Sequence, residues 1–205
     1  SGFLSRVFMW MAAGLVVSAL GSYWLFSQPE LMKTVLANRW VFFGLIIGEL
    51  GLVIWLSAAI RSLSAGAATL IFMAYSFLNG ITLTPIFLIY TGASILSTFA
   101  VAAGTFFFFS VYGLTTKKDL TAMGGLMVMG LIGVLIASLV NMFLKSPMLY
   151  WISTYVAVAV FLGLIAWDTQ KLKMIHALGF ENAETEKKAA IIGALTLYLD
   201  FVNLF

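Results

Sequence analysis

The sequence predicts an all-α, polytopic membrane protein: a bundle of seven transmembrane helices in one transmembrane domain covering residues 1–205. Apolar residues make up 62% of the chain and charged residues only 9%, whereas a globular chain carries about 25% charged residues. Seven spans of about 20 residues would use roughly 140 positions and leave the rest for loops. This composition excludes a disordered chain and a DNA-binding domain, and the lack of cysteine excludes a disulfide-rich secreted scaffold.

The apolar runs place the spans in chain order. We expect the polar segment from Pro29 to Arg39 to be a loop, and the third span to be broken at Asn79-Gly80 and Pro85, because proline removes a helical hydrogen bond. The seventh span is the weakest, since only 17 residues of it are seen and they include Asp200. The expected spans are about 7–26, 40–60, 66–89, 95–114, 121–143, 150–173 and 189–205.

Small residues within these spans predict close helix packing. Gly44 and Gly48 are separated by three residues, a spacing that lets two helix backbones approach. We expect this pair to pack inside the bundle, and a dimer interface is the alternative.

The basic residues are divided unequally between alternate loops, which predicts the orientation. Eight of the eleven fall on the side of the N-terminus and three on the other side, so the N-terminus is expected in the cytoplasm and the C-terminus outside. Because these cations flank apolar runs, they indicate topology rather than a nucleic-acid partner. The eight are Arg6, Arg61, Lys117, Lys118, Lys171, Lys173, Lys187 and Lys188; the three are Lys33, Arg39 and Lys145.

Three acids fall inside predicted spans: Glu49, Asp168 and Asp200. A charge there costs roughly 2.5–3.5 kcal/mol on insertion scales, so such residues face partners or water and mark functional candidates. Asp200 would lie roughly 16 Å along the seventh helix, and Asp168 roughly 8 Å inside the end of the sixth. These consecutive helices run antiparallel, so the two aspartates are expected to meet.

Two carboxylates in a dry site cannot both ionise easily, so a shared proton would make the Asp168–Asp200 pair a pH-sensitive latch. After losing that proton, the pair would bind a divalent cation such as calcium through its oxygens, with Asn203 as a further pore-lining candidate. Arg61, at the end of the second span, is the candidate latch partner. No motif for a bound cofactor or a hydrolytic triad is present.

Each residue also has a purely structural interpretation. Glu49, the other candidate pore-lining residue, would tie two helices together through hydrogen bonds. Asp168 would lie at a helix end in the membrane–water interface, and Arg61 would anchor the cytoplasmic side. His176 is expected in a solvated polar loop.

Four segments resemble one family. Gly193–Phe205 (GALTLYLDFVNLF) closely resembles the terminal signature of the transmembrane Bax inhibitor motif family. Ala166–Lys173 is similar to that family's preceding Asp-containing segment, and Asn79–Pro85 and Tyr112–Leu120 resemble its helix-three element and the loop after helix four. The resemblance covers essentially the whole chain and is strongest to the bacterial branch.

This resemblance implies a seven-helix bundle with a central seventh helix and a pH-dependent calcium leak across the membrane. It implies a di-aspartyl pH sensor, which falls on Asp168 and Asp200, and an arginine latch, which falls on Arg61. Glu49 matches an acidic position of some members. The bacterial branch further implies an inner (plasma) membrane location.

We therefore expect a pH-gated cation leak channel that is not an enzyme and whose partners are the lipid bilayer, protons and calcium. A non-conducting regulator that binds another membrane protein is the alternative. An intramembrane aspartyl protease also pairs two aspartates, but Leu-Tyr-Leu-Asp200 lacks the Gly-x-Gly-Asp pattern of such enzymes.

Overall fold

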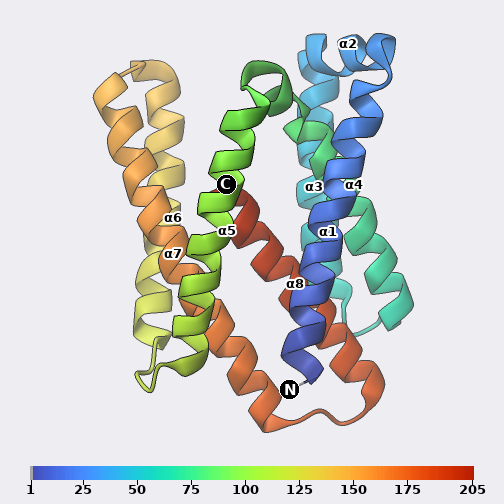
Figure 1. Ribbon diagram of the computed structural model, residues 1–205, viewed down its shortest axis with the longest axis vertical. Helices are drawn as coiled ribbons and strands as arrows, with labels where there is room; N and C mark the ends of the chain where they lie inside the picture. Colours follow the sequence, from blue (N-terminus) through green and yellow to red (C-terminus); the bar gives the residue numbers. More distant parts are fainter. Residues whose placement is uncertain (1) are drawn as a thin grey trace. The chain divides into compact units, whose positions relative to one another are not determined.

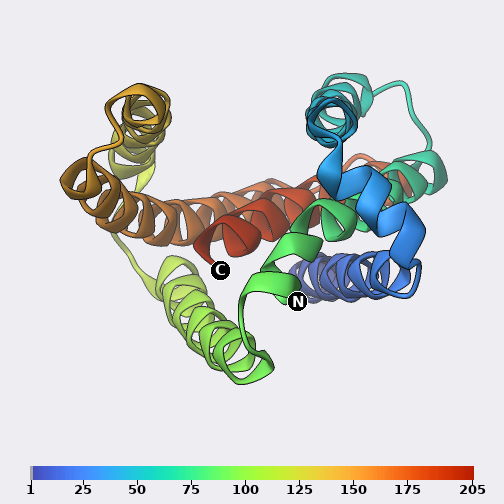
Figure 2. The same ribbon diagram turned by 90° about the horizontal axis from the view of Figure 1, so that it is seen from above.

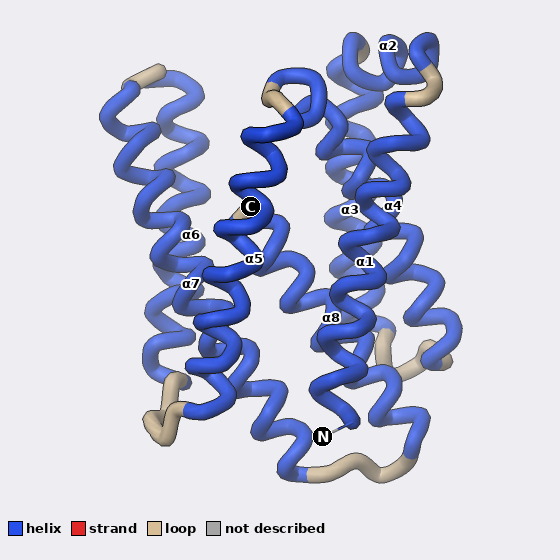
Figure 3. The backbone as a smooth tube through the Cα atoms, in the orientation of Figure 1, coloured by secondary structure: helices blue, strands red, loops and turns tan. Residues whose placement is uncertain are grey.

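The computed structural model describes residues 2–205, which form helices joined by short connections (Figures 1 and 3). The helices are α1 Gly2–Phe26, α2 Pro29–Ala37, α3 Arg39–Ala59, α4 Ala65–Ile89, α5 Gly92–Thr115, α6 Thr121–Leu144, α7 Pro147–Leu178 and α8 Ala183–Leu204.

Six of these helices, α1 and α3 to α7, are long and apolar enough to cross a membrane by length and composition. The prediction of an all-α, polytopic membrane protein is thereby confirmed. α8 is not among the six, because it begins with four charged residues within six positions and also holds Asp200. The count of seven spans stays a prediction.

The polar segment after α1 is a helix, so the loop predicted from Pro29 to Arg39 was wrong. Proline at the first helical position favours a helix start, because its missing N–H would have no partner there anyway. Asn38 then separates α2 from α3: its side chain accepts hydrogen bonds from the N–H groups of Trp40 (3.0 Å) and Val41 (3.4 Å).

The polar segment of residues 168–188, which was predicted to be partly a loop, is also mostly helical. α7 continues to Leu178 rather than ending at Lys173, and His176 lies partly buried in its last turn instead of in a solvated loop. The connection to α8 is only residues 179–182, and Gly179 has a φ of +80° that ends the helix in the conformation glycine adopts most easily.

α4 runs without interruption through Asn79-Gly80 and Pro85, so the predicted break was wrong. Hydroxyl groups supply hydrogen bonds in this segment: Ser22 Oγ and Thr84 Oγ1 (3.3 Å) both donate to the carbonyl of Gly80. The helical donor that Pro85 removes is the one for the carbonyl of Ile81, and membrane helices tolerate such a loss where neighbouring helices enclose the segment, as they do for the buried Ile81.

The chain divides into two compact units. The first unit comprises the residues up to 96 together with 179–198, and the second comprises 97–178 together with 199–205. Each unit is described by itself below.

In the first unit, α1 packs closely along α4. The backbones approach so tightly that a Cβ atom at Gly80 would overlap the carbonyl oxygen of Ser18, and one at Gly21 would overlap that of Phe77. Ser18 Oγ adds a hydrogen bond to the carbonyl of Ser76 (2.7 Å). Small residues and hydroxyls therefore hold these two helices together, as is typical in membranes.

Gly44 and Gly48 have no atom of a neighbouring element within 4 Å of a Cβ position, so the tight packing predicted for this pair inside the bundle was wrong. Their spacing alone does not determine which helix faces meet.

In the second unit, α6 and α7 lie side by side (Figures 1 and 2). A Cβ atom at Gly124 would overlap the ring of Trp167, and one at Gly163 would overlap the side chain of Met127. α5 meets α7 just as closely, since a Cβ at Gly113 would overlap the carbonyl oxygen of Ala166.

The connection between α5 and α6 is tied to α7 by one side chain. Gln170 Oε1 accepts from the N–H of Leu120 (2.9 Å), and Gln170 Nε2 donates to the carbonyl of Lys118 (2.8 Å). Lys173 Nζ adds a bond to the carbonyl of Leu114 (2.6 Å). This stretch of α7 therefore has a fixed position relative to the α5–α6 connection.

We expect Gly80→Ala to destabilise the first unit by about 1–3 kcal/mol, since the added methyl group must displace the α1 backbone. Thermal unfolding in detergent measures the effect. Gly44→Ala is the matched control: it adds the same atom where the space is open, so its stability should be equal or higher because alanine favours helix. Equal destabilisation by both substitutions would contradict the close α1–α4 contact.

We expect Gln170→Leu to loosen the α5–α6 connection, because two backbone groups lose their partner. Two hydrogen bonds of about 1 kcal/mol each correspond to roughly thirtyfold faster trypsin cleavage after Lys117 or Lys118. Cleavage after Lys187 or Lys188 in the same sample is the internal control and should not change. An unchanged rate after Lys117 and Lys118 would show that Gln170 does not hold this connection.

Candidate functional site

Asp168 and Asp200 occupy interior positions of long helices. Asp168 lies roughly 32 Å from the start of α7 and roughly 15 Å from its end. The predicted depth of 8 Å was too small because α7 continues beyond Lys173 by more than one turn. Asp200 lies roughly 26 Å from the start of α8 and one turn before its end.

The structure brings these two aspartates together within the second unit. Their carboxyl groups are hydrogen-bonded to each other, and the residues are only 7% and 5% exposed. A hydrogen bond between two carboxyl groups requires a proton on one of them. Within residues 2–205, Oδ2 of Asp200 has no hydrogen-bond partner. The two carboxyl groups therefore form a buried acidic pair.

Apolar side chains adjoin Asp200 along α8. Phe201, next to Asp200, is buried and its ring makes edge-to-face contacts with Phe106 (5.7 Å between centroids) and Phe99 (5.4 Å). One turn beyond Asp200, Leu204 packs against a buried cluster of α7 that includes Leu164. Such an environment strengthens the interaction between the two carboxyl groups.

Lys171 is a cation near the pair that was counted from the sequence only among the basic residues that set the orientation. It lies three residues after Asp168, on the same face of α7. Its Nζ lies 5.2 Å from the centroid of the Trp167 ring. The three-residue spacing was the signal in the sequence that indicated this neighbour.

Glu49 is buried in the first unit and links two helices. Its Oε1 accepts a hydrogen bond from Thr82 Oγ1 of α4 (3.0 Å). Close by in α4, Asn79 Nδ2 donates to the hydroxyl of Tyr75 (2.9 Å). This geometry matches the structural interpretation of Glu49 as a tie between helices, and its pore-lining role stays a prediction.

Tyr198, two residues before Asp200, was not among the residues predicted from the sequence. Its side chain is fully buried, its hydroxyl is hydrogen-bonded to Ser18 Oγ (2.5 Å), and its ring meets Phe72 and Tyr75 edge to face, each at 5.8 Å. A Cβ atom at Gly14 would also contact this ring. In the sequence, the small residues Gly14, Ser18 and Ser22 recur every four positions on α1, and this spacing indicated that a large side chain could pack against them.

Arg61 and Asn203 contact neither aspartate in any described interaction. Arg61 is exposed in the turn after α3 and belongs to the first unit, where its carbonyl accepts a hydrogen bond from Lys188 Nζ (3.1 Å). Asn203 is exposed, and its Nδ2 donates to the carbonyl of Leu199 (2.7 Å). The predicted latch and pore-lining roles of these residues stay predictions.

The acidic side chains of Asp168 and Asp200 could supply only some of the ligands that a bound cation needs. No group of three or more Asp, Glu, His or Cys side chains arranged to hold a metal lies within residues 2–205. Calcium takes six to eight oxygen ligands. Asp168 and Asp200 offer four, so backbone carbonyls or water would supply the rest, an arrangement that suits a passing ion better than a tightly held one.

Comparison with known proteins gives the family. The family described as "Inhibitor of apoptosis-promoting Bax1" matches residues 1–205. The Escherichia coli (strain K12) inner membrane protein YbhL is 49% identical over 204 residues, which cover 99% of this chain and 87% of YbhL.

Two further relatives are more distant. An uncharacterized protein of Borreliella burgdorferi is 41% identical over 203 residues (99% of this chain, 88% of the relative), and an uncharacterized membrane protein of Streptococcus pyogenes serotype M1 is 36% identical over 205 residues (99% and 88%). The match along the whole chain, together with these identities, shows that this protein is an integral membrane protein of the Bax inhibitor family.

Proposed function

We propose that the protein is a pH-sensitive cation leak channel with calcium as its permeant ion, gated by the Asp168–Asp200 pair, in a bacterial inner membrane. The observation that carries this proposal is the direct contact of two buried carboxyl groups in an apolar helical environment. Membership in a family that includes an Escherichia coli inner membrane protein supports the location. The excess of basic residues on one side supports a cytoplasmic N-terminus.

The proton between the carboxyl groups acts as the latch. At low pH one proton bridges Asp168 and Asp200 and holds α7 and the end of α8 together, which closes the path. As the pH rises the proton leaves, and two like charges in an apolar setting repel each other. The separated carboxylates then present oxygens to a cation, which enters, binds weakly and leaves.

Asp119 offers a matched control for this mechanism, because it is an aspartate of the same unit in an exposed connection. Hydrogen bonds from the hydroxyl (2.6 Å) and the backbone N–H (2.9 Å) of Thr121 hold the pKa of Asp119 below its usual range. The sign of the shift means that Asp119 loses its proton in acid and stays ionised throughout pH 6–8. It therefore cannot contribute to a pH response in that range.

Calcium flux into proteoliposomes across pH 6–8 tests the proposal. We expect the flux of the unaltered protein to rise with pH, by at most about tenfold per pH unit if one proton is lost. Asp168→Asn and Asp200→Asn remove one titrating group each, and an amide can donate to the remaining carboxylate at any pH, so both variants should lose the pH response. Asp119→Asn should keep it.

Unchanged flux and pH response in both pair variants would contradict the gate. If the unaltered protein conducts no ions and a membrane protein co-purifies with it in mild detergent, the alternative of a non-conducting regulator is correct instead.

A further inference from the structure

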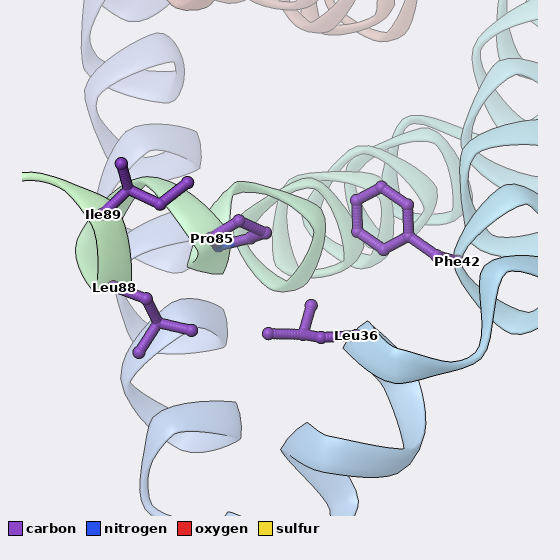
Figure 4. A pocket seen from close by; sticks show the side chains of 5 residues that line it. All are labelled: Leu36, Phe42, Pro85, Leu88 and Ile89. Carbon is purple, nitrogen blue, oxygen red and sulfur yellow. The ribbon is translucent and has the colours of Figure 1, made fainter.

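A second candidate site lies in the first unit, where α2, α3 and α4 surround a pocket of about 280 Å³. The side chains that line it are all apolar: Leu36 of α2, Phe42 of α3, and Pro85, Leu88 and Ile89 of α4 (Figure 4). In Figure 4 the side chains of Leu36, Pro85 and Phe42 point toward the same space. A pocket without polar side chains offers little to orient a polar ligand, but it matches a hydrocarbon chain.

The size of the pocket limits what it can hold. Sites for small molecules measure roughly 300–1,000 Å³, and the pocket lies just below that range. It therefore has room for a section of one acyl chain and not for a whole lipid, whose headgroup must remain outside.

α2 gives the pocket its place at the membrane boundary. This nine-residue helix lies across the ends of α1 and α3, both candidate spans (Figure 1). Its buried Val35 packs with Leu25 and Ile81, while Glu30 and Lys33 are exposed. A short helix with one apolar and one charged face between two spans lies in the membrane–water interface.

Exposed aromatic residues also indicate that this end of the first unit lies at the membrane–water interface. Trp40, in the first turn of α3, is 79% exposed, and Tyr90, directly after α4, is 57% exposed. Exposed tryptophan and tyrosine at helix ends are typical of the headgroup region. The pocket thus lies just below the depth at which phosphate groups are found.

Two basic residues lie where they could bind the phosphate of a lipid headgroup. Lys33 precedes Leu36 by three residues, and Arg39 precedes Phe42 by three, so each lies one turn from a lining residue on the same helix face. Lys33 pairs with Glu30 at 3.2 Å, but this pair is largely exposed and so adds little stability. Arg39 is exposed and forms no described ion pair within residues 2–205, so its guanidinium is available.

We propose that this pocket binds one acyl chain of an anionic phospholipid, whose phosphate is held by Arg39 and Lys33. The occupant comes from the bilayer itself, and the site does not depend on the carboxyl pair. It would attach α2 to the membrane and hold the α2–α3–α4 end of the first unit at a fixed depth.

Lipid titration of the delipidated protein in detergent, followed by native mass spectrometry, tests this site. We expect dioleoyl phosphatidylglycerol to bind at about tenfold lower concentration than dioleoyl phosphatidylcholine, because the second lipid has no net charge. The double variant Lys33→Gln with Arg39→Gln should lose this preference. Lys145→Asn is the charge control: Lys145 is an exposed cation with a φ of 51°, which asparagine tolerates, and it lies far from the pocket in sequence.

Variants that fill the pocket test the acyl chain separately. Leu88→Trp should reduce retention of both lipids, whereas Leu50→Trp, at an exposed position of α3 that does not line the pocket, should not. Ile89→Trp replaces Leu88→Trp if the latter does not fold. Equal binding of the two lipids, unchanged retention in the filled variants, or displacement of phosphatidylglycerol by inorganic phosphate would each overturn the proposal. None of these outcomes bears on the calcium flux, so the two proposals can fail independently.

Discussion

Close approach of helix backbones is the constraint on which this protein depends. In a bilayer, apolar side chains gain little by leaving lipid for another helix, so helices associate where small residues let van der Waals contacts and hydroxyl hydrogen bonds form. Here those places are specific: Gly80 against Ser18 in the first unit, and Gly113 against Ala166 in the second. Large side chains such as Tyr198 are accommodated where glycine leaves space for them.

The same constraint determines the surroundings of the acidic pair. Asp168 follows Ala166 by two residues, and Gln170, two residues further on, holds the α5–α6 connection. The carboxyl group therefore projects from a stretch of α7 that is fixed at both sides by backbone contacts.

The membrane class, seven of the eight helices within residues 2–205 and the aspartates that meet were predictable from the sequence. The prediction succeeded there because a charge in an apolar run is a strong signal whatever the neighbours are: Asp168 and Asp200 stand out without any knowledge of packing. The prediction failed for α2 because a polar segment was interpreted as a loop, and for the continuity of α4 because proline was interpreted as a helix breaker. Pro29 instead begins a helix, and Pro85 is tolerated within one.

The sequence also did not reveal which residues of different helices pack against each other. Gly44 and Gly48 have the spacing of a contact face but lie in open space, whereas Gly80 was considered only as part of a break. A glycine pattern shows that close approach is allowed and does not identify the partner. The contacts of Glu49 and Tyr198 were hidden for the same reason, since each depends on residues of another helix.

The contacts between α1 and α4 have a regular offset. Ser18 meets Ser76 and Ser22 meets Gly80, each 58 positions apart, and Gly14 meets Phe72 at the same offset. Because small residues recur every four positions on α1, a slide of one helical turn, about 5.4 Å, would place one small residue where another had been. Two positions are exceptions: the ring of Phe72 would then face Ser18 instead of Gly14, and Gly80 would face Phe26 instead of Ser22. These two contacts together set the register of the two parallel helices.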